Sequence, residues 1–258
     1  MTSNAPIGIF DSGLGGISVA KEIHALLPHE NIIFYGDSAH APYGVRSTED
    51  VQKLSMNVAN TLIEQGAKAI VIACNTATSA AAELMRSSYS IPIIGMEPAL
   101  KLACDLGAGQ PQHVIVTATE LTLREKKFAA LMERFAQTHT IEKQPCPELV
   151  DIIENGYFED ADRVNATLQH YLDAYPLDSV NSIVLGCTHF TYYRDYFRAL
   201  VPQHVRIVDG NEGTARHVRD VLAERDELAS NNNEGTIILL NSSDDPRMME
   251  LSNYFWSL

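Results

Sequence analysis

The sequence has few cysteines, a deficit of basic residues and no long apolar run. Its four cysteines lie at positions 74, 104, 146 and 187, with no CxxC pair and no histidine pair at metal-ligand spacing. We therefore expect neither a disulfide framework nor a metal site. Lysine and arginine total 19 against 33 acidic residues, which gives a formal net charge of −14. Because no basic run could follow a phosphate backbone, neither nucleic acid nor an anionic membrane is an expected partner.

The apolar runs are short. None approaches the roughly 20 residues that cross a bilayer. The first residues, MTSNAPIGIF, lack a basic segment followed by a long apolar one. We expect a soluble, cytoplasmic protein. With 258 residues, the chain can bury a large core, either as one large domain or as two smaller ones.

Two short segments nearly repeat one another, and each contains a cysteine. AIVIACNTAT surrounds Cys74 and SIVLGCTHF surrounds Cys187, and in each an apolar run leads into a cysteine followed by hydroxyl or amide side chains. A buried cysteine is often inert, but a thiol between a strand and a helix lies where backbone N–H groups and the helix dipole stabilise a thiolate. The repeat predicts two acid/base thiols, whereas we expect Cys104 and Cys146 to serve in packing.

Short β-branched runs alternate with amphipathic stretches, which is typical of parallel sheets with crossover helices. Eight strands are predicted: IGIF from residue 7, NIIFYGD from 31, AIVIAC from 69, IPIIGM from 91, HVIVTAT from 113, SIVLGC from 182, VRIVDG from 205 and TIILLN from 236. Helices are predicted from an N-cap at Ser47 to Gly66, over 121–136 and over 162–174. This order fits open doubly wound sheets, and it also fits a (β/α)8 barrel.

Polar residues follow the predicted strands, and in both folds functional groups collect beyond the carboxyl ends of the strands. These residues are Asp11, Ser12, Asp37, Ser38, Cys74, Asn75, Thr76, Thr119, Cys187, Thr188 and His189. Each also has a simpler interpretation. The glycine-rich DSGLGG (11–16) and APYG (41–44) are typical of tight turns. Asn75, Thr76 and Thr188 could cap helices, and His189 could be a core histidine.

Five ordered motifs carry a family resemblance. IGIFDSGLGG, YGDSAHAPYG, ACNTAT, IIGMEPALK and LGCTHF occur in this order from Ile7 to His189, with a looser echo in NSSDDPRMMELSNYFW at the end of the chain. The chain thereby resembles the glutamate racemases of the aspartate/glutamate racemase superfamily. The resemblance implies two pseudo-symmetric α/β domains, each a mostly parallel sheet flanked by helices, with the active site in the cleft between them. It implies one domain from 1–98 with 208–258 and a second from 99–207.

The resemblance also implies a reaction and its residues. It implies cofactor-independent interconversion of L- and D-glutamate for peptidoglycan, with Cys74 and Cys187 as catalytic bases. Racemisation removes the α-proton from one face and returns a proton to the other, so two groups must flank one carbon. Asp11 is expected near Cys74, and Glu154 and His189 near Cys187, as auxiliary catalytic groups. The implied substrate-binding residues are Asp11, Ser12, Pro42, Tyr43, Gly44, Asn75, Thr76, Thr119, Thr188 and His189.

Some choices stay open at the level of sequence. The chain departs from the usual family pattern at Ser38, His40 and Thr191, where threonine, a basic residue and proline are more common. Aspartate racemases share the two-cysteine scaffold, so a related racemase that acts on aspartate or a hydantoin is a second alternative. A non-catalytic ligand-binding or regulatory protein is a third. A homodimer is expected because the family often forms one.

Overall fold

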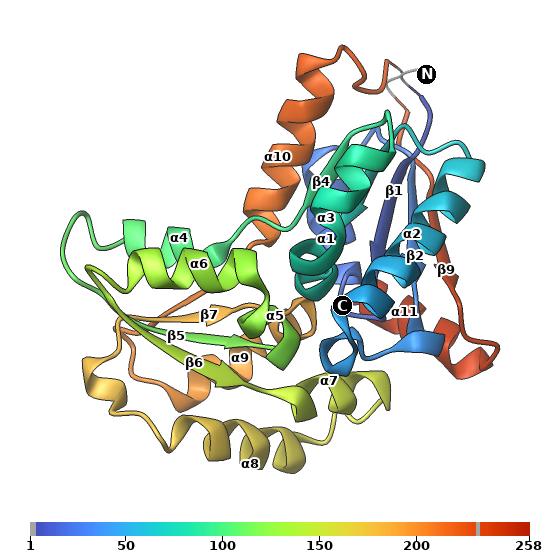
Figure 1. Cartoon of the computed structure of the whole chain (residues 1–258). Helices are drawn as coiled ribbons and strands as arrows, with labels where there is room; N and C mark the ends of the chain where they lie inside the picture. The colour runs from blue at the N-terminus through green and yellow to red at the C-terminus, as the bar shows by residue number, and fades with distance from the viewer. Residues whose placement is uncertain (1–3, 231–232) are drawn as a thin grey trace.

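The computed structural model describes residues 4–230 and 233–258 and contains two separate sheets of parallel strands (Figure 1). The first sheet has the strand order β4-β3-β1-β2-β9, and the second has the order β6-β5-β7-β8. Helices cover both sheets. The expected α/β class with two parallel sheets is confirmed, and the barrel alternative is wrong because the strands close into no single sheet.

The first sheet is built mostly from the N-terminal part of the chain. Its strands are β1 (Ile7–Asp11), β2 (Ile32–Gly36), β3 (Ala69–Ile72), β4 (Ile93–Gly95) and β9 (Ile237–Asn241). Its helices are α1 (Ile17–Leu26), α2 (Thr48–Glu64), α3 (Asn75–Ser88), α10 (Asn211–Glu224) and α11 (Pro246–Ser257). The C-terminal strand β9 pairs in parallel with β2, with Asn241 opposite Gly36. The end of the chain thus returns to the sheet in which it began.

The second sheet is built from the middle of the chain. Its strands are β5 (His113–Ala118), β6 (Thr140–Pro145), β7 (Ser182–Leu185) and β8 (Arg206–Val208). Its helices are α4 (Ala99–Asp105), α5 (Glu120–Arg124), α6 (Lys126–Phe135), α7 (Pro147–Glu154), α8 (Ala161–Leu172) and α9 (Arg194–Leu200). Single turns of 3₁₀ helix complete the structure at η1 (Ser38–His40), η2 (Tyr43–Val45), η3 (Leu177–Ser179) and η4 (Thr188–Tyr193).

The inner strands are apolar because helices cover both faces of each sheet. Along β5, Ile115 packs into the cluster that contains α8, whereas Val114 and Val116 pack into the cluster that contains α4. Such double burial explains why the strands read as continuous apolar runs rather than alternating ones. The cluster around Ile115 also contains Ile9 of the first sheet, so one core joins the two sheets.

The two sheets share a strand order. In the first sheet, β2, β1, β3 and β4 lie side by side in that sequence, and in the second sheet β6, β5, β7 and β8 do the same. Each sheet therefore has its first strand between its second and third. We call the first sheet with its helices the first half of the molecule, and the second sheet with its helices the second half. Cys74 follows the third strand of the first half, and Cys187 follows the third strand of the second half.

The predicted elements agree with the structure except in two places. All eight predicted strands are present, but β6 was missed because its sequence TIEKQP is polar and lies at a sheet edge. The helix expected over 121–136 is two helices, α5 and α6, separated at Glu125, whose ψ of 131° is extended. The Ser47 side chain caps α2 by accepting from the backbone N–H of Asp50, as predicted. No helix among the described residues is long and apolar enough to cross a bilayer.

Candidate active site

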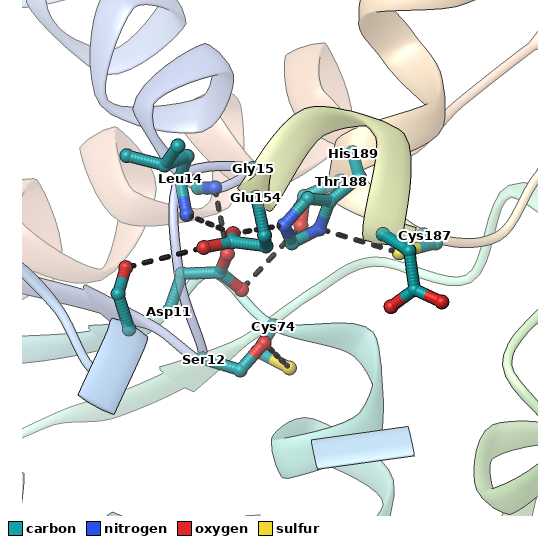
Figure 2. Close-up of polar contacts among 12 residues, drawn as sticks. Asp11, Ser12, Leu14, Gly15, Cys74, Glu154, Cys187, Thr188 and His189 are labelled. Carbon is teal, nitrogen blue, oxygen red and sulfur yellow. Dashed lines mark hydrogen bonds and ion pairs between the residues drawn. The ribbon is translucent and has the colours of Figure 1, made fainter. Parts of the chain in front are cut away.

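The predicted site residues come together where the carboxyl ends of strands from both sheets meet (Figure 2). A hydrogen bond joins the two halves here, because Thr188 Oγ1, after β7, donates to Asp11 Oδ1, at the end of β1, over 3.4 Å. A second contact joins Gly44 to Thr119, since a Cβ added at Gly44 would lie 2.6 Å from Thr119 Cβ. The site is therefore assembled from both sheets.

Cys74 lies between β3 and α3 as the N-cap of the helix. Its Sγ accepts a hydrogen bond from the backbone N–H of Ala77 at 3.4 Å, and its thiol donates to Ser12 Oγ at 3.6 Å. Burial raises the pKa of the Cys74 thiol above its ordinary value, the negative charge of Asp11 raises it further, and a thiolate at Cys187 adds to the rise. The environment of Cys74 thus favours the protonated thiol, and Cys187 is near enough to influence it.

Cys187 has a different neighbour. Its Sγ lies 3.6 Å from His189 Nδ1, and His189 Nε2 lies 2.6 Å from Glu154 Oε1. Burial disfavours the charged imidazole, but the hydrogen bonds to Cys187 and Glu154 and the charges of both groups leave the pKa of His189 well above its ordinary value. A protonated imidazole at this distance would stabilise a thiolate at Cys187.

Glu154 is the last residue of α7 and reaches from the second half into the first. Its Oε1 accepts from the backbone N–H of Leu14 at 2.7 Å, and its Oε2 accepts from Ser38 Oγ at 3.2 Å (Figure 2). Its side chain is 12 % exposed. Together with His189, these donors hold the carboxylate in one orientation.

The glycines of the DSGLGG segment are needed for this close approach. A Cβ at Gly13 would lie 2.0 Å from Glu154 Oε1, and a Cβ at Gly15 would lie 2.4 Å from His189 Nδ1. Real side chains cannot approach so closely. The segment is therefore a turn, as the simpler interpretation held, and it is also the surface against which the groups near Cys187 pack.

Asp11 is fully buried at the centre of the site. Its Oδ2 accepts from the backbone N–H of Gly16 at 2.9 Å, which together with the Thr188 hydroxyl provides donors for both oxygens. Burial raises the pKa of Asp11, although the nearby His189 opposes this rise. Asp11 is close enough to Cys74 to raise the pKa of its thiol, and it also contacts Thr188 beside Cys187.

Three threonine hydroxyls form a cluster between the two halves. Thr76 Oγ1 lies 2.9 Å from Thr119 Oγ1 and 3.0 Å from Thr122 Oγ1, and the last two lie 2.9 Å apart. Thr119 is also the N-cap of α5, where it accepts from the Thr122 N–H. Thr122 was missed, and the only signal for it in the sequence was its place three residues after a capping threonine.

The remaining predicted residues lie at the edge of this cluster. Asn75 is half-buried at the first position of α3. Tyr43 is buried, and its hydroxyl donates to Asp37 Oδ2 at 2.5 Å. The Tyr43 phenol is thus bound to Asp37, and Gly44 is the residue of this turn that lies against Thr119. Pro42 precedes them in extended conformation.

Two further features delimit the site. A cavity of about 1100 Å³ lies between α1, α4 and α10, but its lining, which includes Glu97, Asp209 and His217, contains neither Cys74 nor Cys187. Over residues 4–230 and 233–258, no group of three or more His, Cys, Asp or Glu side chains is arranged to hold a metal ion. The groups gathered at the strand ends are two thiols, two carboxylates, an imidazole and several hydroxyl and N–H donors.

Comparison with known proteins gives one consistent result. Residues 14–218 match the family model described as Asp/Glu/Hydantoin racemase. The chain is 59% identical over 252 residues to the glutamate racemase of Bifidobacterium animalis subsp. lactis (strain AD011), and the match covers 98% of each protein.

Solved structures show the same similarity. A glutamate racemase isoform from Bacillus anthracis superimposes with a TM-score of 0.88 at 27% identity, covering 99% of this chain and 95% of that one. The glutamate racemase of Francisella tularensis subsp. tularensis SCHU S4, solved in complex with D-glutamate, gives a TM-score of 0.84 at 26% identity over the same shares.

Proposed function

Because the chain belongs to the Asp/Glu/Hydantoin racemase family, we propose that it interconverts L- and D-glutamate with Cys74 and Cys187 as the two acid/base groups and without a cofactor. The observation that carries this proposal is the placement of two buried thiols after the equivalent third strands of the two sheets. Two groups at opposite sides of one cleft can remove a proton from one face of the α-carbon and deliver one to the other.

The environments of the thiols suggest their starting states. Burial and Asp11 hold the proton on Cys74, whereas His189 can stabilise a thiolate at Cys187. In one direction the Cys187 thiolate takes the α-proton while the Cys74 thiol gives its proton to the opposite face. The substrate is inverted, and Cys187 is now protonated and Cys74 ionised. In the other direction the roles exchange, so no proton is gained or lost overall.

The carbanionic character that develops at the α-carbon needs neutral dipoles nearby. We assign this role to donors that can hold the substrate carboxylates, from Ser12, Gly44, Asn75, Thr76 and Thr188. The N-terminus of α3, which begins at Asn75, adds the positive end of a helix dipole and the backbone N–H groups of its first residues. Such preorganised donors attract an anionic substrate locally even though the net charge of the chain is −14.

The wider role follows from the proposed reaction. D-Glutamate formed in this way would supply peptidoglycan synthesis. We also propose the domain division 1–98 with 208–258 and 99–207, which the pairing of β9 with β2 supports. A cytoplasmic homodimer stays a prediction.

The proposal is tested by incubating the purified protein with L-glutamate in D₂O without added cofactor. We expect deuterium at the α-position by NMR and a decay of optical rotation to zero. Cys74→Ala and Cys187→Ala should each lower the rate by at least about 10³-fold, because each removes a general acid/base. Cys104→Ala, a buried thiol in α4, is the matched control and should keep full activity.

Three results would contradict the proposal. Full activity in either the Cys74 or the Cys187 variant would exclude the two-thiol mechanism. Exchange with aspartate and not with glutamate would reassign the substrate. Exchange with neither would leave a non-catalytic binding protein as the better description.

A further inference from the structure

The C-terminal strand β9 delivers one polar side chain toward the catalytic groups. Asn241, the last residue of β9, donates from Nδ2 to Ser38 Oγ at 3.0 Å, and Ser38 Oγ donates to Glu154 Oε2 at 3.2 Å. Glu154 in turn binds His189, which lies beside Cys187. A chain of contacts therefore runs from Asn241 through Ser38, Glu154 and His189 to Cys187.

The directions of the two hydrogen bonds at Ser38 are fixed by the network. Asn241 Oδ1 accepts from the backbone N–H of Ser243 at 2.9 Å, so the amide nitrogen must be the atom that faces Ser38. With Asn241 donating into its oxygen, the Ser38 hydroxyl has its single hydrogen free for Glu154. Asn241 thereby determines which way the Ser38 hydroxyl points.

The backbone is shaped to admit the Asn241 side chain. Gly36 lies directly opposite Asn241 in the β2–β9 pair. A Cβ at Gly36 would lie 3.1 Å from Asn241 Nδ2 and 2.9 Å from the carbonyl oxygen of Gly13. The absence of a side chain at Gly36 leaves room for the amide between β2 and the glycine-rich turn.

We propose that Asn241 is a positioning residue for the racemase reaction, which acts through Ser38 to hold the Glu154 carboxylate against His189 and so governs the proton affinity of the groups that serve Cys187. This inference rests on the proposed function for its activity readout. Asn241 belongs to the C-terminal segment, where the family resemblance is weakest. The inference gives this segment a role in supporting the groups around Cys187. Cys74 lies outside this chain of contacts, and burial, Asp11 and Ser12 act on its pKa more strongly than the charge of Cys187 does.

Other ionisable groups also face Glu154 and must be considered in any pH dependence. His189 approaches from η4, Asp11 from β1, Tyr192 from η4 and Asp151 from the same helix, and each is within electrostatic reach of Glu154. A substitution at position 241 replaces none of these four side chains. A shift in titration that follows a substitution of Asn241 is therefore attributable to the Ser38 hydrogen bond or to the charge introduced.

The test compares Asn241→Ala and Asn241→Asp with the wild-type protein. The aspartate variant has the same shape and keeps the acceptor for Ser243, but it replaces the donor to Ser38 with an acceptor and adds a negative charge. Both variants weaken the hold on the Glu154 carboxylate, because the Ser38 hydroxyl is no longer fixed toward Glu154 in Asn241→Ala and can donate to the new carboxylate in Asn241→Asp. We expect kcat/KM to fall about fivefold for Asn241→Ala, and more than tenfold for Asn241→Asp.

A second measurement separates positioning from general damage. Alkylation of each cysteine by iodoacetamide is followed by mass spectrometry as a function of pH. We expect the pH profile of Cys187 alkylation to shift in both Asn241 variants, more for Asn241→Asp, while the profile of Cys74 in the same molecules shifts less. The matched control is Asn31→Ala, which removes an asparagine that accepts from the Thr236 N–H at the other end of the same strand pair. It should leave both profiles and kcat/KM unchanged.

The outcomes are distinct. An unchanged Cys187 profile in both Asn241 variants overturns the inference, as does an equal shift of both cysteines or a Cys187 shift of the same size in Asn31→Ala. If the wild-type protein fails to racemise glutamate, the proposed function fails, while the alkylation profiles still decide whether Asn241 controls Cys187.

Discussion

The two thiols differ in their immediate partners. Cys74 has a backbone N–H, a serine hydroxyl and a buried carboxyl group near it, whereas Cys187 has an imidazole bound to a carboxylate. The letters that follow each cysteine, NT and TH, already place His189 beside Cys187. Because L- and D-glutamate have equal free energy, kcat/KM must remain equal in the two directions, so this difference between the thiols can show only in kcat and KM taken separately.

Gly15 permits the closest approach to His189. We expect Gly15→Ala to lower kcat/KM by about 100-fold, since displacement of a catalytic group by about 1 Å is enough for such a loss. The added Cβ would lie 2.4 Å from His189 Nδ1 and 2.6 Å from its backbone nitrogen, so rotation of the ring cannot relieve both contacts. Stability should fall by about 1–3 kcal/mol, measured by thermal unfolding.

The control for Gly15→Ala is a glycine whose replacement strains the backbone without a collision. Gly109 has a φ of +86°, no atom lies within 4 Å of the position that a Cβ would occupy there, and the residue belongs to a turn after α4. Gly109→Ala should lower stability by about 1 kcal/mol and keep kcat/KM. Equal loss of activity in both variants would show that reduced stability, and not the position of His189, is the cause.

The site residues that could not be predicted from the sequence are those that lie far apart along the chain and are brought into contact by the fold. Ser12, Thr76 and Thr188 were predictable because polar residues beyond parallel strands collect at one edge. Glu154 lies 35 positions from His189 along the chain, and only the family resemblance pointed to it. Asn241 lies 203 positions from Ser38, and no local pattern marks it, because its role depends on β9 pairing with β2.

At the scale of elements, the near-repeat around the cysteines has a structural origin. AIVI and SIVL are the third strands of two halves with the same strand order, and each is buried on both faces. Because both strands are buried on both faces, both need an apolar sequence, and this produces the similarity between the two segments. Strand β6 was missed for the opposite reason, because a half-exposed edge strand carries Glu142 and Lys143 and has no such run.

Helix α2 offers a test of an element that was predicted in full. Its N-cap Ser47 accepts from the Asp50 N–H at 3.1 Å and is exposed, so little else depends on its hydroxyl. Ser47→Ala should lower stability by about 1 kcal/mol and the melting temperature by about 3 °C. Ser47→Asp, which restores a capping oxygen, should melt close to the wild-type temperature.

The same variants test whether the Ser47 cap affects activity. The helix begins just after the turn that holds Gly44 against Thr119, but Thr48 provides a separate anchor by donating to Glu125 Oε1 at 2.5 Å. We therefore expect kcat/KM of Ser47→Ala to stay within about twofold of the wild-type value, which a lost exposed cap of this size allows. A tenfold loss would show that the cap also positions the turn.

At the scale of the whole molecule, one buried ion pair binds the segment that leads the chain back from α10 to β9 in the first sheet. Lys68 Nζ, just before β3, lies 2.6 Å from Glu30 Oε2, just before β2, and both side chains are almost fully buried. Lys68 Nζ also donates to the Glu227 carbonyl, and Glu30 Oε1 accepts from the Ala229 N–H. Two strands of the first sheet are thus joined to the segment that leads from α10 toward β9.

Removal of one member of this pair should therefore destabilise the whole fold. We expect Lys68→Met to cost about 3–5 kcal/mol, because it leaves Glu30 buried without its countercharge, and to lower the melting temperature by roughly 10 °C. Combining it with Glu30→Leu should recover part of the loss, since no buried charge then remains, although the Ala229 N–H still loses its acceptor. The control is Arg219→Met, which breaks a pair with Asp220 that is 44 % and 57 % exposed and should change stability by less than about 1 kcal/mol. If Lys68→Met costs no more than Arg219→Met, the return of the chain is held by the β2–β9 pairing and apolar packing alone.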